Sequence, residues 1–110
     1  MIEKPKRLRN VFVALGDTNL TSVYTCPSNF VGVIKEVMVC NVDGSASADI
    51  TINFNRSSTN YPIVYTVTVD NDATLDLLNK SIYLEEGDSL NATASVDGDL
   101  TIVCSYEIIE

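Results

Sequence analysis

The stretch Ala48-Asp49-Ile50-Thr51-Ile52-Asn53-Phe54-Asn55 alternates apolar and polar side chains without a break. A period of two is the pattern of a β-strand that buries one face and wets the other. Residues 100–109 (LTIVCSYEII) repeat the pattern at the end of the chain. Between them lie shorter runs of the same kind, and no stretch has a helical period long enough to compete. The sequence therefore predicts an all-β fold.

Turn signals built from Gly, Asp, Asn and Pro divide the chain into eight or nine expected strands. These cover residues 10–15, 20–26, 32–42, 48–55, 63–69, 73–78, 81–84, 89–96 and 100–109. Residues 32–42 are apolar on both faces and are expected to form a central strand or one that contacts a neighbour. Lys35 and Glu36 interrupt this run and are expected at a bend or at an exposed end of the strand. A polar loop, residues 56–61, is expected inside one hairpin, and Asp97-Gly98-Asp99 is interpreted as a second hairpin turn.

This spacing predicts a single antiparallel β-sandwich of about eight strands. A jelly-roll topology is favoured over an immunoglobulin-like one, because the chain has no Trp to pack in the core and no pair of cysteines expected to bridge the sheets. Helix is expected to be limited to one turn near residues 76–80. A length of 110 residues fits one domain.

The net charge of −8 is unevenly placed. Residues 1–9 hold four bases and one acid, a net +3, whereas the other 101 residues hold 14 acids and three bases, a net −11. We therefore expect a basic N-terminal arm, residues 1–9, and an acidic sandwich domain, residues 10–110. The acidic domain should repel nucleic acid and anionic membranes, so neither is an expected partner.

The arm has two interpretations, a solubilising terminus or a tail that binds an acidic neighbour, including a second copy of this chain. Its bases, Lys4, Lys6, Arg7 and Arg9, are candidate interface residues. Tyr61 joins them, because it stands beside Pro62 in the expected loop and is the tyrosine expected to be exposed. The other tyrosines are expected to fill the core or its rim.

The sequence contains no recognisable set of catalytic or metal-binding residues. The chain has no His, so a nucleophilic triad fails, and the paired carboxylates fall in expected turns, where Asp is common for backbone reasons. Cys26, Cys40 and Cys104 form no CxxC pair and are interpreted as buried, reduced thiols, with a zinc site as the alternative. No cofactor, metal or enzymatic activity is expected.

Three stretches carry a resemblance: residues 20–27 (LTSVYTCP), residues 33–41 (VIKEVMVCN) and residues 84–90 (LEEGDSL), followed by the closing Glu107-Ile108. In this order and spacing they resemble small virion structural proteins of tailed bacteriophages. The resemblance implies a role in assembly, on the capsid as a decoration (cement) protein or in the neck, tail or a fibre. It supplies no catalytic residue.

The leading hypothesis is thus a non-enzymatic virion protein, made in the bacterial cytoplasm, that decorates a capsid. Its expected partners are other virion proteins and further copies of itself, bound through loops, the arm or an exposed strand edge in residues 73–84. The alternative is a lectin-like receptor-binding module, against which the scarcity of expected exposed aromatic residues counts.

Overall fold

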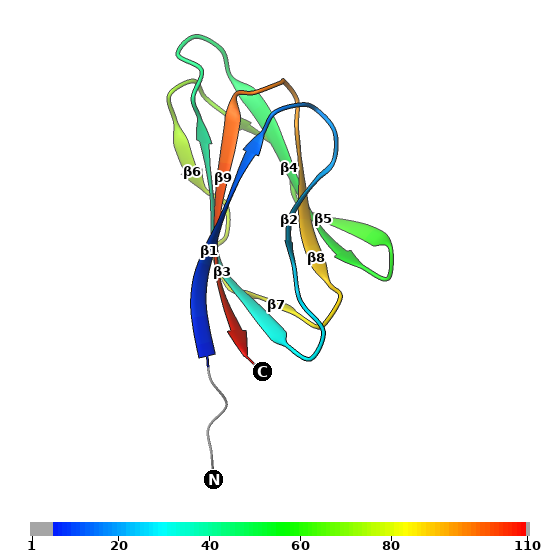
Figure 1. The fold of residues 1–110 in the computed structure, drawn as a ribbon. Coiled ribbons are helices and arrows are strands. Elements are labelled where there is room, and N and C mark those ends of the chain that lie inside the picture. The colour runs from blue at the N-terminus through cyan, green and yellow to red at the C-terminus, as the bar shows by residue number, and fades with distance from the viewer. Residues whose placement is uncertain (1–5, 110) are drawn as a thin grey trace.

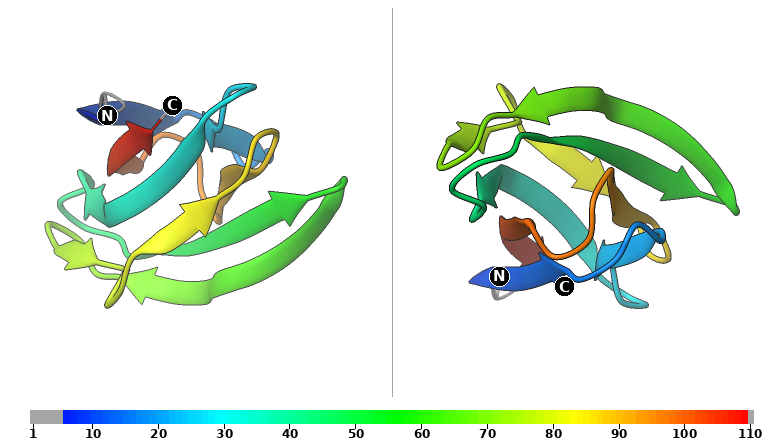
Figure 2. Two further views of the ribbon diagram at one scale, coloured as in Figure 1. Left: turned by 90° about the horizontal axis from the view of Figure 1, so that it is seen from below. Right: turned by 90° about the horizontal axis from the view of Figure 1, so that it is seen from above.

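The computed structural model describes residues 6–109, which form two antiparallel β-sheets packed face to face (Figures 1 and 2). The strands are β1 (Lys6–Leu15), β2 (Thr21–Thr25), β3 (Val31–Asn41), β4 (Ala48–Arg56), β5 (Thr59–Val69), β6 (Thr74–Asp76), β7 (Ile82–Leu84), β8 (Ser89–Ala94) and β9 (Leu100–Ile109). Sheet A has the order β1-β9-β3-β6, with β7 also paired to β3, and sheet B has the order β2-β8-β4-β5. The predicted all-β sandwich is confirmed.

The pairing of the strands gives the jelly-roll topology. The chain runs out through β1, β2, β3 and β4 and returns through β5 to β9, so that β4 pairs with β5, β3 with β6 and β7, β2 with β8, and β1 with β9. This folded ribbon of antiparallel pairs is the jelly-roll arrangement expected from the sequence. The nine strands agree with the eight or nine expected, and β6 and β7 share one edge of β3 at different positions along it.

The core lies between the two sheets and uses the alternation that predicts the strands. Ile50 and Ile52 of sheet B are fully buried, as are Ile102 and Cys104 of sheet A. The central position of β3 is confirmed, since it lies between β9 and the pair β6 and β7. A register shift between Ile34 and Glu36 marks a β-bulge at the expected bend, and it lets the polar pair pass without turning a charge into the core.

The β4–β5 hairpin differs from the expected long loop. Its strands continue to Arg56 and Thr59, and only Ser57 and Ser58 form the turn, with φ angles of 55° and 64°. Two successive residues with positive φ make the type I′ turn that matches the twist of a hairpin. The hairpin itself is as expected. Because Asn-Gly or Asp-Gly is the usual sequence for this turn, the Ser-Ser pair did not indicate that the turn has only two residues.

The other expected hairpin turn is wrong. Residues 97–99 do reverse the chain, with Gly98 at a φ of 75°, but β8 belongs to sheet B and β9 to sheet A. The turn therefore crosses between the sheets. A turn signal reports a reversal of direction and not which strand becomes the neighbour. The expected helical turn near residues 76–80 is also absent from the described chain, where Thr74–Asp76 forms β6 and a loop follows.

The first strand begins at Lys6, four residues before the expected start. Its ten residues pair with β9 in unbroken register, from Lys6 opposite Ile109 to Leu15 opposite Leu100. Residues 6–9 are thus part of sheet A, and their basic side chains do not prevent pairing because strand pairing uses backbone groups. A free arm stays a prediction for residues 1–5, which lie outside the described residues together with residue 110.

Candidate interaction surface

The outer face of sheet A carries rows of side chains that run across the strands, and several large apolar residues stand in them. One row joins Leu8 of β1, Glu107 of β9, Val33 of β3 and Tyr83 of β7. A second row joins Phe12, Val103, Met38 and Asp76. Leu8, Phe12 and Tyr83 are 75%, 70% and 68% exposed. Large apolar side chains therefore gather on the side of sheet A that points away from the core.

The outer face of sheet B has the opposite character. One row joins Ser22, Asn91 and Asn53 to Pro62, and the next joins Thr25, Ser89, Asn55 and Asn60. The asparagine side chains form a network. Asn53 Nδ2 donates to Asn91 Oδ1 at 3.1 Å, and Asn60 Oδ1 accepts from Asn91 Nδ2 at 3.0 Å and from Asn55 Nδ2 at 2.8 Å. Asn53 and Asn91, at the centre of the network, are buried, and their side chains are hydrogen-bonded within the sheet face.

A sandwich that faces water on both sides is polar on both outer faces. The rows across β2, β8 and β4 of sheet B meet that description, although the edge strand β5 exposes Tyr65. The outer face of sheet A exposes Leu8, Phe12 and Tyr83, large apolar side chains of the kind that mark protein interaction sites, on either side of a polar row. The outer face of sheet A is therefore the candidate interaction surface.

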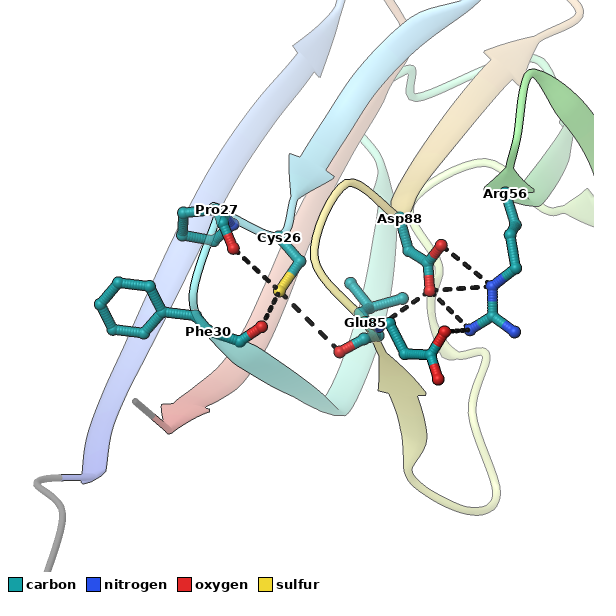
Figure 3. Close-up of polar contacts among 7 residues, drawn as sticks. Cys26, Pro27, Phe30, Arg56, Glu85 and Asp88 are labelled. Atoms are coloured by element: carbon teal, nitrogen blue, oxygen red, sulfur yellow. Dashed lines mark hydrogen bonds and ion pairs between the residues drawn. The ribbon is translucent and has the colours of Figure 1, made fainter.

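An ion pair fixes the hairpin end of sheet B, as Figure 3 shows. The Arg56 guanidinium donates from Nε to both Asp88 carboxylate oxygens, at 3.0 and 3.1 Å, and from Nη2 to Asp88 Oδ2 at 2.6 Å. The Glu85 backbone N–H donates to the same carboxylate at 2.8 Å. Asp88 is only 4% exposed. The Arg56 contact, opposed by burial, holds the pKa of Asp88 below its ordinary value.

The turn that carries Asp88 also closes the loop between β2 and β3. Gly87, with a φ of 86°, lets this turn form, and its N–H donates to the Cys26 carbonyl at 2.9 Å. The Cys26 N–H in turn donates to the Asp88 carbonyl at 2.8 Å, and the Cys26 thiol donates to the Phe30 carbonyl at 3.4 Å (Figure 3). These contacts give the Glu85–Asp88 turn a structural role, as the sequence indicated for Gly87 and Asp88.

The cysteines do not share one environment. Cys26 and Cys104 are buried free thiols, as expected, whereas Cys40 is only half-buried, on the outer face of sheet A. Burial raises the pKa of Cys104 to about 11 and also raises the pKa of Cys26, to which the nearby Asp88 carboxylate adds. A raised pKa leaves little thiolate at neutral pH, and the thiolate is the reactive form.

Titration of the native protein with a thiol reagent should therefore show one faster-reacting cysteine, Cys40, and two that react only on unfolding. The Cys40→Ser variant should lose the faster phase and keep the other two thiols. A native protein in which Cys104 reacts as fast as Cys40 would show that sheet A opens readily.

The candidate interface residues from the sequence are not brought together. Lys4 lies outside the described residues, and Lys6 begins β1. Arg7 and Arg9 are exposed on β1, whereas Tyr61 is exposed on β5, an edge strand of the other sheet. A role for these residues in binding stays a prediction.

Exposed aromatic residues are more numerous than the sequence suggested. Tyr65 is 70% exposed on β5, and Tyr83 is exposed on β7. Tyr24 and Tyr106 match the expected rim position, with ring centroids 4.0 Å apart, and burial raises the pKa of Tyr24 to about 12. Phe12 and Leu8 were missed as surface residues because the alternation of β1 does not tell which face meets the core.

Within residues 6–109 no pocket is found, nor any group of three or more potential metal ligands. The same residues include no helix that could cross a membrane.

No protein-family model matches the chain, and no curated protein matches its sequence. Solved structures match its fold. A chain in the acidic stable capsid of Helicobacter pylori bacteriophage KHP30 is 12% identical, with a TM-score of 0.59 over 99% of this chain and 90% of that one. A chain in the capsid asymmetric unit of cyanophage Pam1 is 10% identical, with a TM-score of 0.55 over 99% and 87%.

The fold is not confined to capsids. The Drosophila NLP-core, described in terms of pentamer formation and histone binding, is 10% identical, with a TM-score of 0.52 over 91% of this chain and 96% of that one. At such identities the likeness shows the fold alone. The chain is thus a single jelly-roll sandwich of the kind found in these proteins.

Proposed function

We propose that this chain is a non-enzymatic structural protein of a bacteriophage virion, and within the particle a capsid decoration protein. The observation that carries the proposal is the contrast between the two outer faces. A subunit seated on a particle covers one face and presents the other to water. Here the outer face of sheet A exposes the large apolar side chains of Leu8, Phe12 and Tyr83, whereas β2, β8 and β4 of sheet B present a hydrogen-bonded polar network.

Two further observations support the proposal. The fold likeness includes chains of two phage capsids, which use the same jelly roll over nearly the whole length of this chain. The sequence also resembles small virion proteins of tailed phages over most of residues 18–108. A protein with this role must contact further copies of itself and other virion proteins. The likeness to the NLP-core, which is described in terms of pentamer formation, agrees with self-association.

Labelled antibody against this chain, applied to intact particles of the phage that carries its gene, tests the proposal. Label spread over the capsid is the expected result. Label confined to the neck, tail or fibres would support a virion protein but place it outside the capsid, which would overturn the decoration role. Absence of the chain from purified particles would overturn the whole proposal.

The basic residues of β1 have a proposed part in this attachment. Arg7 and Arg9 are exposed, and the body of the chain is acidic, so these side chains suit an acidic neighbour. Replacing both by Ala should weaken binding to particles, and added salt should weaken the binding of the parent chain, because exposed charges are screened over about 8 Å at physiological salt. Lys35→Ala and Lys80→Ala, two exposed bases elsewhere, form the matched control. Unchanged binding and salt dependence would leave these arginines without a role in attachment.

A lectin-like receptor-binding module is the second candidate, favoured by the exposed Tyr61 and Tyr65 on β5. Binding of the purified chain to a glycan array, lost on replacing both tyrosines by Ala, would select it over decoration.

A further inference from the structure

The strand edges of the two sheets differ in what they offer to another strand. Sheet B ends at β2, which has five residues and a register shift, and at β5, which contains Pro62, two register shifts and a positive φ at Thr66. Proline and bulges interrupt the backbone groups that an added strand needs. The far edge of sheet A is formed by β6 and β7, each of three residues.

The remaining edge, β1, is long and regular. Ten consecutive residues pair with β9 without a register shift, no proline interrupts them, and no other described strand pairs with their free side. Leu8 and Phe12 project from this edge on the outer face of sheet A and are largely exposed. Among the described edges, β1 is thus the one that offers an extended ladder together with apolar side chains.

An added strand must offer an equally long and regular edge. Among the strands of residues 6–109, β1 itself is the one that meets that condition, so the fitting partner edge is β1 of a second copy. Two identical strands that pair about a two-fold axis do so antiparallel, which is an isologous contact.

The side chains select one register for this pairing. If Asn10 lies opposite Asn10 of the second copy, Leu8 lies opposite Phe12 at both ends of the contact, Arg9 lies opposite Val11, and Arg7 lies opposite Val13. Aliphatic–aromatic cross-strand pairs are favourable, and like charges directly opposite one another are not. A shift of one residue toward the N-terminus would place Arg9 opposite Arg9.

We infer that this chain forms a two-fold dimer in which the free edges of two β1 strands pair antiparallel about Asn10. The pairing joins the two copies of sheet A into one continuous sheet and merges their apolar outer faces. It buries Leu8 against Phe12 of the other copy. The inference concerns the purified chain alone, so its failure would leave the proposed virion role to be decided by the antibody experiment.

A single introduced cysteine tests the register. In a Cys40→Ser background, Asn10→Cys places two thiols opposite each other across the two-fold axis, with Cβ atoms about 5 Å apart, which is within reach of a disulfide after small adjustment. Ala14→Cys is the matched control, since position 14 is exposed on the same face of the same strand but pairs with position 6. Mild oxidation of the dilute protein should link Asn10→Cys into dimers and leave Ala14→Cys largely unlinked.

A second measurement follows the mass of the unlinked protein in solution. Sedimentation equilibrium should show a monomer–dimer equilibrium that Phe12→Ser shifts toward monomer by at least tenfold in dissociation constant, while Tyr65→Ser, an equally exposed tyrosine on β5, leaves it unchanged. Circular dichroism should show both variants folded. Equal linking of the two cysteine variants would overturn the register, and a chain that stays monomeric at every concentration would overturn the dimer and leave β1 for a strand of another protein.

Discussion

The Ile52→Asp variant should lose about 4 kcal/mol of unfolding free energy, the scale of an unpaired charge placed in a core. Ile52 is 1% exposed in β4, and its neighbours across the sheet are Ala92 of β8 and Val64 of β5, both buried. No Lys or Arg is among the buried residues of the described chain, so no buried base is available to pair with the carboxylate. Since small domains have a total stability of about 5–15 kcal/mol, a large share of the molecules should be unfolded at modest denaturant concentrations. Chemical denaturation followed by far-UV circular dichroism measures the loss.

Ser22→Asp is the matched control, because it adds the same charge at an exposed position on the outer face of sheet B. Its unfolding free energy should stay within about 0.5 kcal/mol of the parent chain. If the Ile52→Asp variant melts within a degree or two of the parent, Ile52 does not face the core, and the assignment of the buried face of β4 is wrong.

The Asp88→Ala variant should lose about 1.5–3 kcal/mol, the range for hydrogen bonds to a charged group. The change removes the bidentate Arg56 contact and leaves the Glu85 N–H without its acceptor at the base of the turn. The effect should extend to β2 and β3, because the same turn holds the Cys26 backbone. Hydrogen exchange at the amides of Cys26 and Gly87 should therefore speed up together with the global loss.

The ion pair also predicts a direction for pH. Arg56 holds the pKa of Asp88 below its unfolded value, so the stabilisation is complete above the ordinary carboxyl range and disappears as pH falls through the lowered folded pKa. The difference in stability between the parent chain and Asp88→Asn should shrink on acidification. A difference that stays constant down to the acid limit would show that the carboxylate charge is not what Arg56 stabilises.

Strand alternation and the spacing of turns were enough to predict the sandwich, because β4 and β9 each bury one face in register with their neighbours. The jelly-roll topology was favoured by the lack of Trp and of a bridging cysteine pair. The sequence pattern also located the central strand β3 and the turn at Gly87 and Asp88. Connectivity was harder to predict. The residue 97–99 turn looks the same whether the chain stays in one sheet or crosses to the other, and the Ser57-Ser58 turn uses residues that rarely mark a hairpin.

The candidate surface was less predictable than the fold. Phe12 and Leu8 lie on a strand whose other face, with Val11 and Val13, packs against the core, and the sequence alone does not distinguish the two faces. The basic residues drew attention to residues 6–9 as an arm, although the backbone there pairs with β9. The candidate surface is identified by comparing the rows of side chains that cross four strands of sheet A. Those rows can be drawn only when the pairing register of the strands is known.

The pairing of β1 with β9 places the two ends of the described chain side by side, with Lys6 opposite Ile109 at one pole of the sandwich (Figure 1). A peptide fused to either end would therefore emerge from the same pole, and the turns at the opposite pole would stay unobstructed. This single exit means that peptides fused at the two termini would compete for the same space. A longer insertion placed in the Ser57-Ser58 turn, remote from both ends in the strand order, would avoid that competition.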